Sequence, residues 1–385
     1  MRTERPTLCA ALCAFILTLF LFTTVFRTAA LAQTTPTTSP SPGGPPRDLE
    51  EGFAVSPIPI VKSVTEEGGG LAVEYKYRLN PKSVLSSSSS TAAGGFITTN
   101  RSWGAGLYQK VFLNDDRWQL RFAGSYAEIL YNYYGIGTAA GAAGGSSGIS
   151  VLMFQRGVGA LGDVLFRLGE MWYAGPQYRW LRTKARFRDN PQFTQPINPN
   201  DLDTHVGMLG PRFMRDSRSD ANYPRDGSFF DLRAGFTGAG TGSQLTYQAY
   251  NLSYAKFIST APRQVLAMRG ATCIARGATP FWDECIVTSS ENLRGYRSSR
   301  YRDANFLAAQ AEYRWEAWGP VGFVAFGGAG EVAPKYTDFN TGNILPSGGV
   351  GVRFRLTRES HLNFRFDYAW GKDSRQMYFN FGEAF

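Results

Sequence analysis

The sequence predicts an all-β protein: a transmembrane antiparallel β-barrel of about 16 strands. The first observation is alternation. Between His361 and Trp370 every second residue is apolar or aromatic, and the residues between them are polar. A period of two indicates a strand with two different faces. The second observation is that the run Val350–Leu356 places Arg353 and Arg355 on one face. A buried core rarely accepts two arginines, whereas a water-filled lumen does.

Composition is the third observation. The 385 residues include 43 Gly, 28 Phe, 19 Tyr and 8 Trp, and only 18% of residues are charged. Abundant glycines and aromatics suit strands that are apolar on one face only. Beyond the N-terminal segment there is no run of about 18 apolar residues, which excludes later membrane-spanning helices.

The N-terminus has the pattern of a targeting segment. Basic residues precede an apolar run from Leu8 to Val25, and a small-x-small cleavage site ends at Ala32. We therefore expect residues 1–32 to be a cleaved signal peptide, the alternative being an uncleaved anchor. Residues 33–52 are rich in Thr, Ser and Pro and predict a disordered linker before a barrel over 53–385. The chain is thus expected to be exported to the bacterial outer membrane.

Alternating runs separated by Gly, Asn, Asp, Ser and Pro predict about sixteen strands. An even number keeps both ends of a single-chain barrel on the inner side. The four N-terminal strands are the least defined, because FITTNRSWGAGLYQKVF can also form one long strand. The predicted strands are 54–64, 69–79, 91–100, 102–112, 117–132, 149–168, 172–188, 204–216, 228–237, 244–258, 264–276, 304–317, 320–332, 347–357, 361–371 and 376–385.

Loop lengths give the orientation, since outer-membrane barrels have short periplasmic turns and longer external loops. The short connections 318–319 and 358–360 are then periplasmic. One periplasmic turn, 217–226, is long and stands as an exception. The external loops are 133–148, 189–203, 277–303 and 333–346.

Charges and cysteines limit the possible partners. The formal net charge of +9 is spread over strands and loops, so no nucleic-acid site is predicted, and outer-membrane lipid headgroups are the expected anionic partner. Cys273 and Cys285 remain after signal cleavage and can form a disulfide in an oxidising compartment, although sequence leaves their pairing open. No metal-binding spacing and no cofactor motif is found.

The C-terminal stretch YFNFGEAF predicts an insertion signal. Phe379, Phe381 and Phe385 share one parity on a strand that should face lipid, and such a terminal aromatic marks barrels for insertion. Glu383 has the same outward parity and is expected at the membrane edge, where a charge costs little.

Four motifs together resemble the BamA/TamA superfamily of outer-membrane barrels, also called the bacterial surface antigen family. The resemblance covers residues 53–385, and five strands follow the motif loop, as in that family. The first motif is PIPIVKSVTEEGGGLAVEYKY, a first hairpin. The second is a turn with Asp216, Arg218, Pro224 and Gly227. The third is LRGYRSSRYRD, with Arg294, Gly295 and Tyr296. The fourth comprises QAEYR, VAFGGAG and the terminal YFNFGEAF.

The resemblance implies that the motif loop folds into the barrel and that its arginine, Arg294, binds an acidic inner wall. Glu312 has inward parity and matches the family's strand carboxylate. A guanidinium forked onto a carboxylate is a strong and geometrically specific contact. The family often has an aspartate on the next strand, where this chain has Gly328. We therefore expect Arg294 to rest on Glu312 alone, the alternative being that Arg294 is a solvated loop residue.

The resemblance also implies a role in outer-membrane protein assembly or translocation. The stretch between Gln33 and Phe53 has no room for a periplasmic POTRA domain, which predicts a barrel-only member. Its expected partners are the barrel-assembly machinery or a separate periplasmic subunit. The alternative is a passive channel or structural protein. An enzyme is not expected, because neither His205 nor His361 has a nucleophile at a recognisable spacing.

Overall fold

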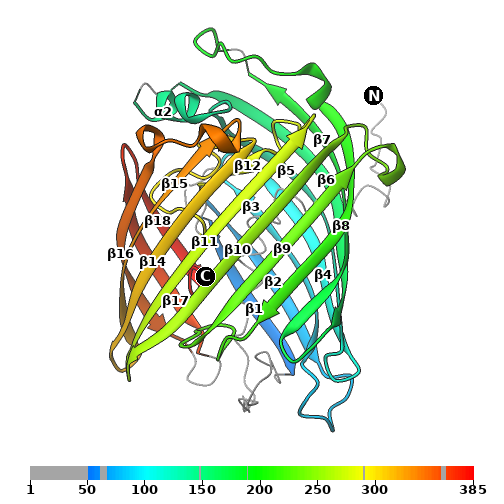
Figure 1. Ribbon diagram of the computed structural model, residues 1–385, viewed down its shortest axis with the longest axis vertical. Coiled ribbons are helices and arrows are strands. Elements are labelled where there is room, and N and C mark those ends of the chain that lie inside the picture. Colours follow the sequence, from blue (N-terminus) through cyan, green and yellow to red (C-terminus); the bar gives the residue numbers. More distant parts are fainter. Residues whose placement is uncertain (1–50, 61–66, 147–148, 189, 289–290, 357–360) are drawn as a thin grey trace, which may run out of the picture.

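Sixteen antiparallel strands form one sheet that curls into a barrel (Figure 1). The structure is a computed structural model that describes residues 51–60, 67–146, 149–188, 190–288, 291–356 and 361–385. Each strand pairs with its neighbours along the chain. The predicted all-β fold and strand number are therefore confirmed. The predicted signal peptide, most of the predicted linker and the turn of the first hairpin lie outside the described residues.

The strands coincide with the predicted ones to within a few residues. FITTNRSWGAGLYQKVF forms two strands, β3 and β4. The strands are β1 Gly52–Ile60, β2 Gly68–Tyr77, β3 Ser89–Thr98, β4 Trp103–Leu113, β5 Trp118–Tyr133, β6 Val151–Arg167, β7 Trp172–Phe187, β8 Asp203–Asp216, β9 Gly227–Thr237, β10 Tyr247–Ala261, β11 Gln264–Gly277, β14 Asn305–Trp318, β15 Val321–Ala333, β16 Leu345–Arg355, β17 Asn363–Gly371 and β18 Arg375–Phe381.

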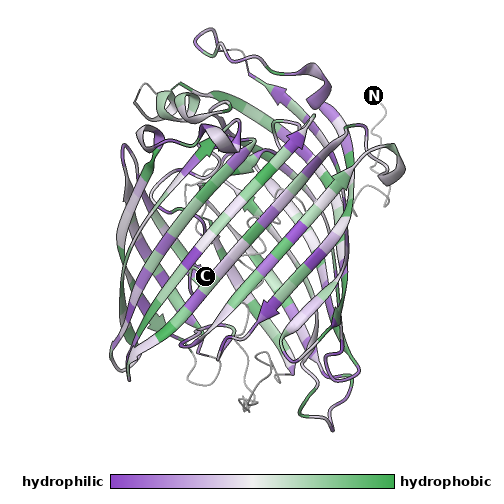
Figure 2. Ribbon diagram, in the orientation of Figure 1, coloured by the Kyte–Doolittle hydropathy of each residue, from purple (hydrophilic) through white to green (hydrophobic). Residues whose placement is uncertain are grey.

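Both faces of the wall follow the sequence period of two. On β14, Tyr313 and Trp315 point outward and are 42% and 44% exposed, whereas Glu312 and Arg314 point inward and are buried. Figure 2 shows the resulting alternation of apolar and polar residues along the strands. The outward residues form an apolar surface, and the inward residues form a polar and charged lumen.

The four connections that were predicted to be external lie at the same end of the barrel (Figure 1). They carry a short helix, α2 (Thr138–Ser146), and a two-stranded ribbon in the motif loop, β12 (Cys285–Ile286) with β13 (Arg302–Asp303). Short 3-10 turns also lie between the strands: η2 Pro199–Asp201, η3 Ala239–Thr241, η4 Tyr336–Asp338 and η5 Thr341–Asn343. Among the described residues, no helix is both long and apolar enough to cross a membrane.

The long inner turn 217–226 reaches across the inner opening. Arg225 Nη1 lies 2.6 Å from a carboxylate oxygen of Glu316 on β14. His361, in the turn before β17, lies 3.2 Å from Asp220, and this hydrogen bond raises the pKa of the imidazole. Because β9, β10 and β11 separate β8 from β14, the turn bridges distant parts of the wall.

The two ends of the sheet meet without a ladder. β1 and β18 lie at opposite ends of the strand order, and among the described residues no backbone pairing joins them. They nevertheless approach each other closely enough to make contacts. The two strands therefore lie side by side and close the barrel, but among the described residues no backbone hydrogen bonds join them along this seam.

The last four residues turn into the lumen, so the predicted outward orientation of Glu383 and Phe385 is wrong. β18 ends at Phe381, and Gly382, at φ +74°, redirects the chain. The Glu383 carboxylate lies 2.7 Å from Nε of Arg353, a buried inner-wall cation that attracts it. Phe385 packs among inner-wall residues of β6 to β11, and Figure 1 marks the C-terminus within the outline of the barrel.

Candidate functional site: the loop clamp on the inner wall

The motif loop, residues 278–304, is attached to the wall at two depths. Near the outer end, Cys273 of β11 forms a disulfide with Cys285 of β12. Cys273 points inward because it is paired in register with Phe306, which also faces the lumen. The disulfide that the sequence left open is therefore present, and it ties the ribbon of the loop to the barrel wall. The deeper attachment is made by Arg294.

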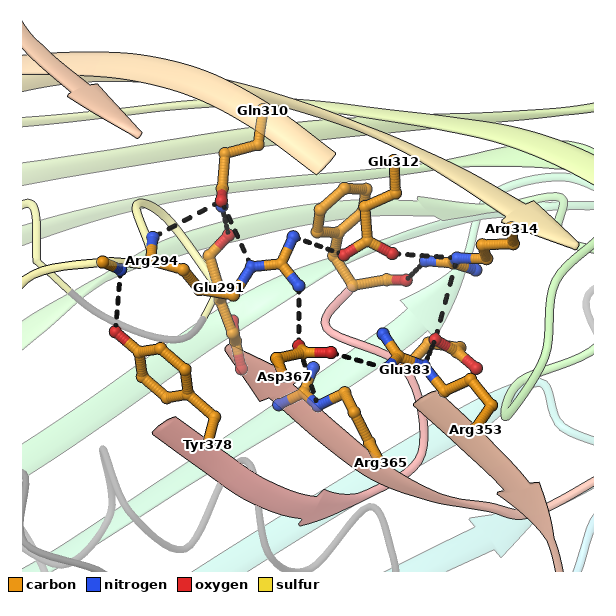
Figure 3. Close-up of polar contacts among 12 residues, drawn as sticks. Glu291, Arg294, Gln310, Glu312, Arg314, Arg353, Arg365, Asp367, Tyr378 and Glu383 are labelled. Atoms are coloured by element: carbon orange, nitrogen blue, oxygen red, sulfur yellow. Dashed lines mark hydrogen bonds and ion pairs between the residues drawn. The ribbon is translucent and has the colours of Figure 1, made fainter. Parts of the chain in front are cut away.

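The Arg294 side chain is fully buried between two strands that lie far apart in sequence (Figure 3). Its Nη2 lies 2.5 Å from Oε1 of Glu312 on β14, and its Nη1 lies 2.8 Å from Oδ2 of Asp367 on β17. Gln310 accepts hydrogen bonds from the Arg294 backbone and from Nε. The guanidinium also stacks 3.5 Å from the centroid of Phe326. We call these five residues the Arg294 clamp.

The expectation that Arg294 rests on Glu312 alone is wrong. The second carboxylate comes from β17, two strands further along than the position of Gly328. Gly328 pairs with Gln310, and a Cβ there would come within 2.6 Å of the Gln310 side chain. The glycine therefore makes room for Gln310 to reach Arg294. The sequence signal for Asp367 was its inward parity in the alternating run 361–370.

The residues beside Arg294 fix the loop backbone. Gly295 has φ +99°, and a Cβ there would meet the backbone of Trp370 at 2.6 Å. Its amide donates to the hydroxyl of Tyr378, which donates in turn to the carbonyl of Tyr296. The Tyr296 hydroxyl donates to the carbonyl of Pro346. The predicted trio Arg294, Gly295 and Tyr296 thus seats the loop on β16, β17 and β18.

A wider ion network surrounds the clamp (Figure 3). Arg314 lies 3.0 Å from Glu312, and Arg353 lies 2.5 Å from Asp367. Glu383 of the inward tail joins the network through Arg353, and Arg314 donates to the main-chain oxygen of Phe385. Buried charges require such pairing, because an unpaired charge away from water is costly. The loop, the wall and the tail therefore share one set of charges.

Other external loops cover the motif loop. Arg300 donates to the carbonyl of Gly141 in α2, and Thr138 donates to the carbonyl of Val332 at the end of β15. Asp201 of the β7–β8 loop accepts from the amide of Phe281, and its carbonyl accepts from the indole of Trp282. The outer opening is thus covered by three loops that hydrogen-bond to one another.

The carboxyl group of Glu284 is partly buried within this cover. Its Oε2 atom is buried and has no hydrogen-bond partner among the described residues. Burial, reinforced by the nearby Asp303 carboxylate, raises the pKa of Glu284 to about 8. Glu284 is therefore mostly protonated at neutral pH.

The predicted family turn is brought together in part. Arg218 forks onto Asp216, at 2.9 and 2.7 Å, and its guanidinium lies over the ring of Phe229. Gly227 has φ +96°, and a Cβ there would lie 1.9 Å from the carbonyl of Ser217, so only glycine fits. Pro224 is buried nearby but does not join the ion pair.

At the last strand, Phe379 packs against Phe366, and Phe381 packs against Phe364, with ring centroids 4.8 and 5.6 Å apart. Both phenylalanines lie on the outward face, as predicted, whereas Phe385, the third residue of the predicted signal, points into the lumen. Among the described residues no group of His, Cys, Asp and Glu is arranged to hold a metal ion.

The sequence matches the Omp85 superfamily domain over residues 85–385. This protein belongs to the Omp85 superfamily. Omp85 barrels are outer-membrane proteins, so the outward face of this barrel contacts lipid. Comparison with curated protein sequences finds no match.

Solved structures show the same fold at low sequence identity. The crystal structure of BamA from Haemophilus ducreyi lacking POTRA domains 1-3 aligns with a TM-score of 0.58 and 14% identity, over 86% of this chain and 70% of that chain. CdiB from Escherichia coli aligns at 0.57 and 8%, over 86% and 62%. CdiB from Acinetobacter baumannii aligns at 0.54 and 11%, over 86% and 58%. The predicted resemblance to BamA-type barrels is confirmed.

Proposed function

We propose that this Omp85 barrel assists the assembly or translocation of outer-membrane proteins through the seam between β1 and β18. The observation that carries the proposal is that, among the described residues, no backbone ladder joins the two strands of this seam. Two facing edges with unpaired backbone groups can accept an incoming strand by β-augmentation. Opening this seam also costs less than opening any other strand pair, since no backbone hydrogen bonds of a ladder need to break.

The inward tail supports the same proposal. β18 has only 7 residues, and Gly382 directs the following residues away from β1. Glu383 is then held by Arg353, inside the lumen. The end of the chain is thus stabilised away from the position that would complete the seam.

We also propose how the protein reaches its membrane and which partners it works with. The chain reaches the outer membrane after cleavage behind Ala32 and acts without enzymatic chemistry. A separate periplasmic subunit or the barrel-assembly machinery delivers clients to the barrel.

The test is a reversible bond across the seam. In a Cys273→Ser/Cys285→Ser background, cysteines are placed at outward positions of β1 and β18, starting from Val55 and Met377, and the pair that crosslinks is reconstituted into vesicles with a periplasmic extract. The readout is the rate at which an unfolded eight-stranded barrel becomes heat-resistant. We expect at least about a tenfold loss when the bond forms, and recovery with reductant.

The matched control joins neighbours that are already paired. Tyr368 and Met377 are register partners on β17 and β18, so a disulfide between them leaves the seam free. Equal insertion rates with the seam closed and open would contradict the proposal. If vesicles with the wild-type protein insert the client no faster than vesicles without protein, and the protein instead conducts ions steadily, the passive channel is the correct function.

A further inference from the structure

The outward surface of β6 and β7 carries a concentration of positive charge near the outer end. Arg182, Lys184 and Arg186 occupy successive outward positions of β7, and Arg156 lies opposite Lys184 on β6. We call these four residues the basic patch. In Figure 2 the arrowhead of β7 is purple, in agreement with a hydrophilic strand end.

The register places the basic patch at the outer edge of the apolar belt, the band of outward apolar residues around the barrel wall. On β7 the preceding outward residues are Tyr178 and Trp180. Tyr178 is paired with Leu209 on β8, and Trp180 with Ala160 on β6. Tyrosine and tryptophan mark the membrane–water interface in barrels. The charges that follow them therefore lie at the level of the lipid headgroups.

Carboxylates neutralise this surface only in part. Asp203 is shared by Lys184 at 2.8 Å and Arg182 at 3.7 Å, and Glu128 lies 2.7 Å from Arg156. Within the part of the chain that the structure describes, four cations thus face two carboxylates. The side chains of Arg156, Arg182 and Lys184 are 52%, 51% and 50% exposed, so their donors are accessible.

The patch is local. At the outer ends of the other described strands, outward-facing basic residues are Arg276 on β11 and Arg375 on β18, one on each strand. A diffuse positive surface would spread such residues around the barrel. Their concentration on two adjacent strands indicates one bound partner.

We propose that the basic patch binds the phosphate groups of lipid headgroups in the external leaflet. Guanidinium groups present forked donors that match phosphate oxygens, and lysine adds a mobile point charge. A cation at a membrane surface attracts anionic lipid with about 1 kcal/mol, or about fivefold in affinity. The position beside the apolar belt selects a lipid, because its acyl chains lie along the belt while its phosphates meet the arginines.

The test measures lipid binding to the full-length protein in neutral-lipid nanodiscs. The probes are diphosphoryl lipid A, the same lipid with its phosphates removed, and inorganic phosphate alone. We expect the wild-type protein to prefer the phosphorylated lipid by more than tenfold. Changing Arg156, Arg182, Lys184 and Arg186 together to Gln should abolish that preference. Asp203→Asn should strengthen binding, because it releases two cations.

The matched control is Arg276→Gln/Arg375→Gln, which removes two outward basic residues elsewhere and should leave binding unchanged. Folding of each variant is checked by its heat-modifiable mobility in SDS gels, and Arg→Lys versions of the patch retain charge if the Gln version misfolds. Unchanged binding after loss of the patch, or equal binding of the dephosphorylated lipid, would overturn the proposal. So would inorganic phosphate that binds as tightly as the lipid.

Discussion

At the residue scale, the structure depends on the contacts that stabilise one buried arginine, Arg294. Arg294 uses both ends of its guanidinium on carboxylates from different strands and its face on an aromatic ring. Lysine offers one point charge and cannot make these contacts together. Four arginines and three carboxylates share the surrounding network, so the position of each charge matters as well as its sign.

Exchanging the charges of Arg294 and Glu312 should not restore stability. A glutamate at 294 would face Asp367, and an arginine at 312 would face Arg314. We expect Arg294→Glu, Glu312→Arg and the double variant each to lose about 3–5 kcal/mol. The measurement is the temperature at which the folded band disappears from SDS gels. Arg297→Glu, an exposed change in the same loop, is the control, and rescue by the double variant would contradict the clamp geometry.

Glu284 should give the outer loops a measurable pH dependence. Its pKa is raised from 4.5 to about 8 in the folded protein. Between these values the folded state holds a proton that the unfolded chain has lost, so stability falls as pH rises through this window. Glu284→Gln should flatten this slope and raise the melting temperature at pH 7.5 by a few degrees. Glu291→Gln is the control, and an unchanged slope in Glu284→Gln would exclude this origin.

At the element scale, the motif loop is held by two chemistries at two depths. The disulfide restrains the ribbon of β12 and β13 near the outer opening, whereas the Arg294 clamp holds the loop against β14 and β17. The first depends on oxidation and the second on charge. Breaking one should therefore loosen only its own part of the loop.

Reduction should expose the outer part of the loop without releasing Arg294. We expect Cys273→Ser/Cys285→Ser to lose about 2–4 kcal/mol, a typical disulfide contribution. Tryptic cleavage after Arg297 and Arg300 should accelerate, while the barrel stays folded at room temperature. Reductant should have this effect on the wild-type protein and none on the cysteine-free variant. Equal cleavage with and without the disulfide would show that it does not restrain the loop.

At the scale of the whole molecule, the barrel is covered at its outer end, and its described residues leave one seam without backbone pairing. Three external loops cover the outer opening through hydrogen bonds, and the inner turn 217–226 crosses the opposite one. A path for ions along the axis is thus obstructed by polar contacts. The seam between β1 and β18 is the part of the wall that opens most easily. This arrangement differs from that of a simple pore.

Single-channel recordings should therefore show a small conductance for the wild-type protein. Arg294→Ala removes the deep attachment of the motif loop and should produce larger and more frequent openings. Arg297→Ala, in the same loop but exposed, should resemble the wild type. A large and steady conductance that is insensitive to Arg294→Ala would favour a passive channel.

Local alternation was enough to predict the wall. The parity of β14 assigned Glu312 to the lumen, and the motif LRGYRSSRYRD identified the arginine that reaches it. Strand parity predicted the wrong orientation for the residues after Phe381, because parity applies only while a strand continues. Gly382 ends β18, and buried Arg353 draws Glu383 inward, a contact between residues 30 positions apart. Asp367 was missed as a partner because nothing local shows that β17 and β14 face the same guanidinium.

Local sequence patterns predict the barrel, its strands and its two faces, because a period of two and turn residues act over a few positions. The loop that enters the barrel was predicted from the resemblance of LRGYRSSRYRD to the family motif. The tertiary structure alone decided which charges meet: the second carboxylate on Arg294, the inward tail, the turn across the inner opening and the basic patch on two adjacent strands. These depend on register and on closure of the wall. Both bring together residues that are distant along the chain, and buried charges then select their partners by distance and geometry.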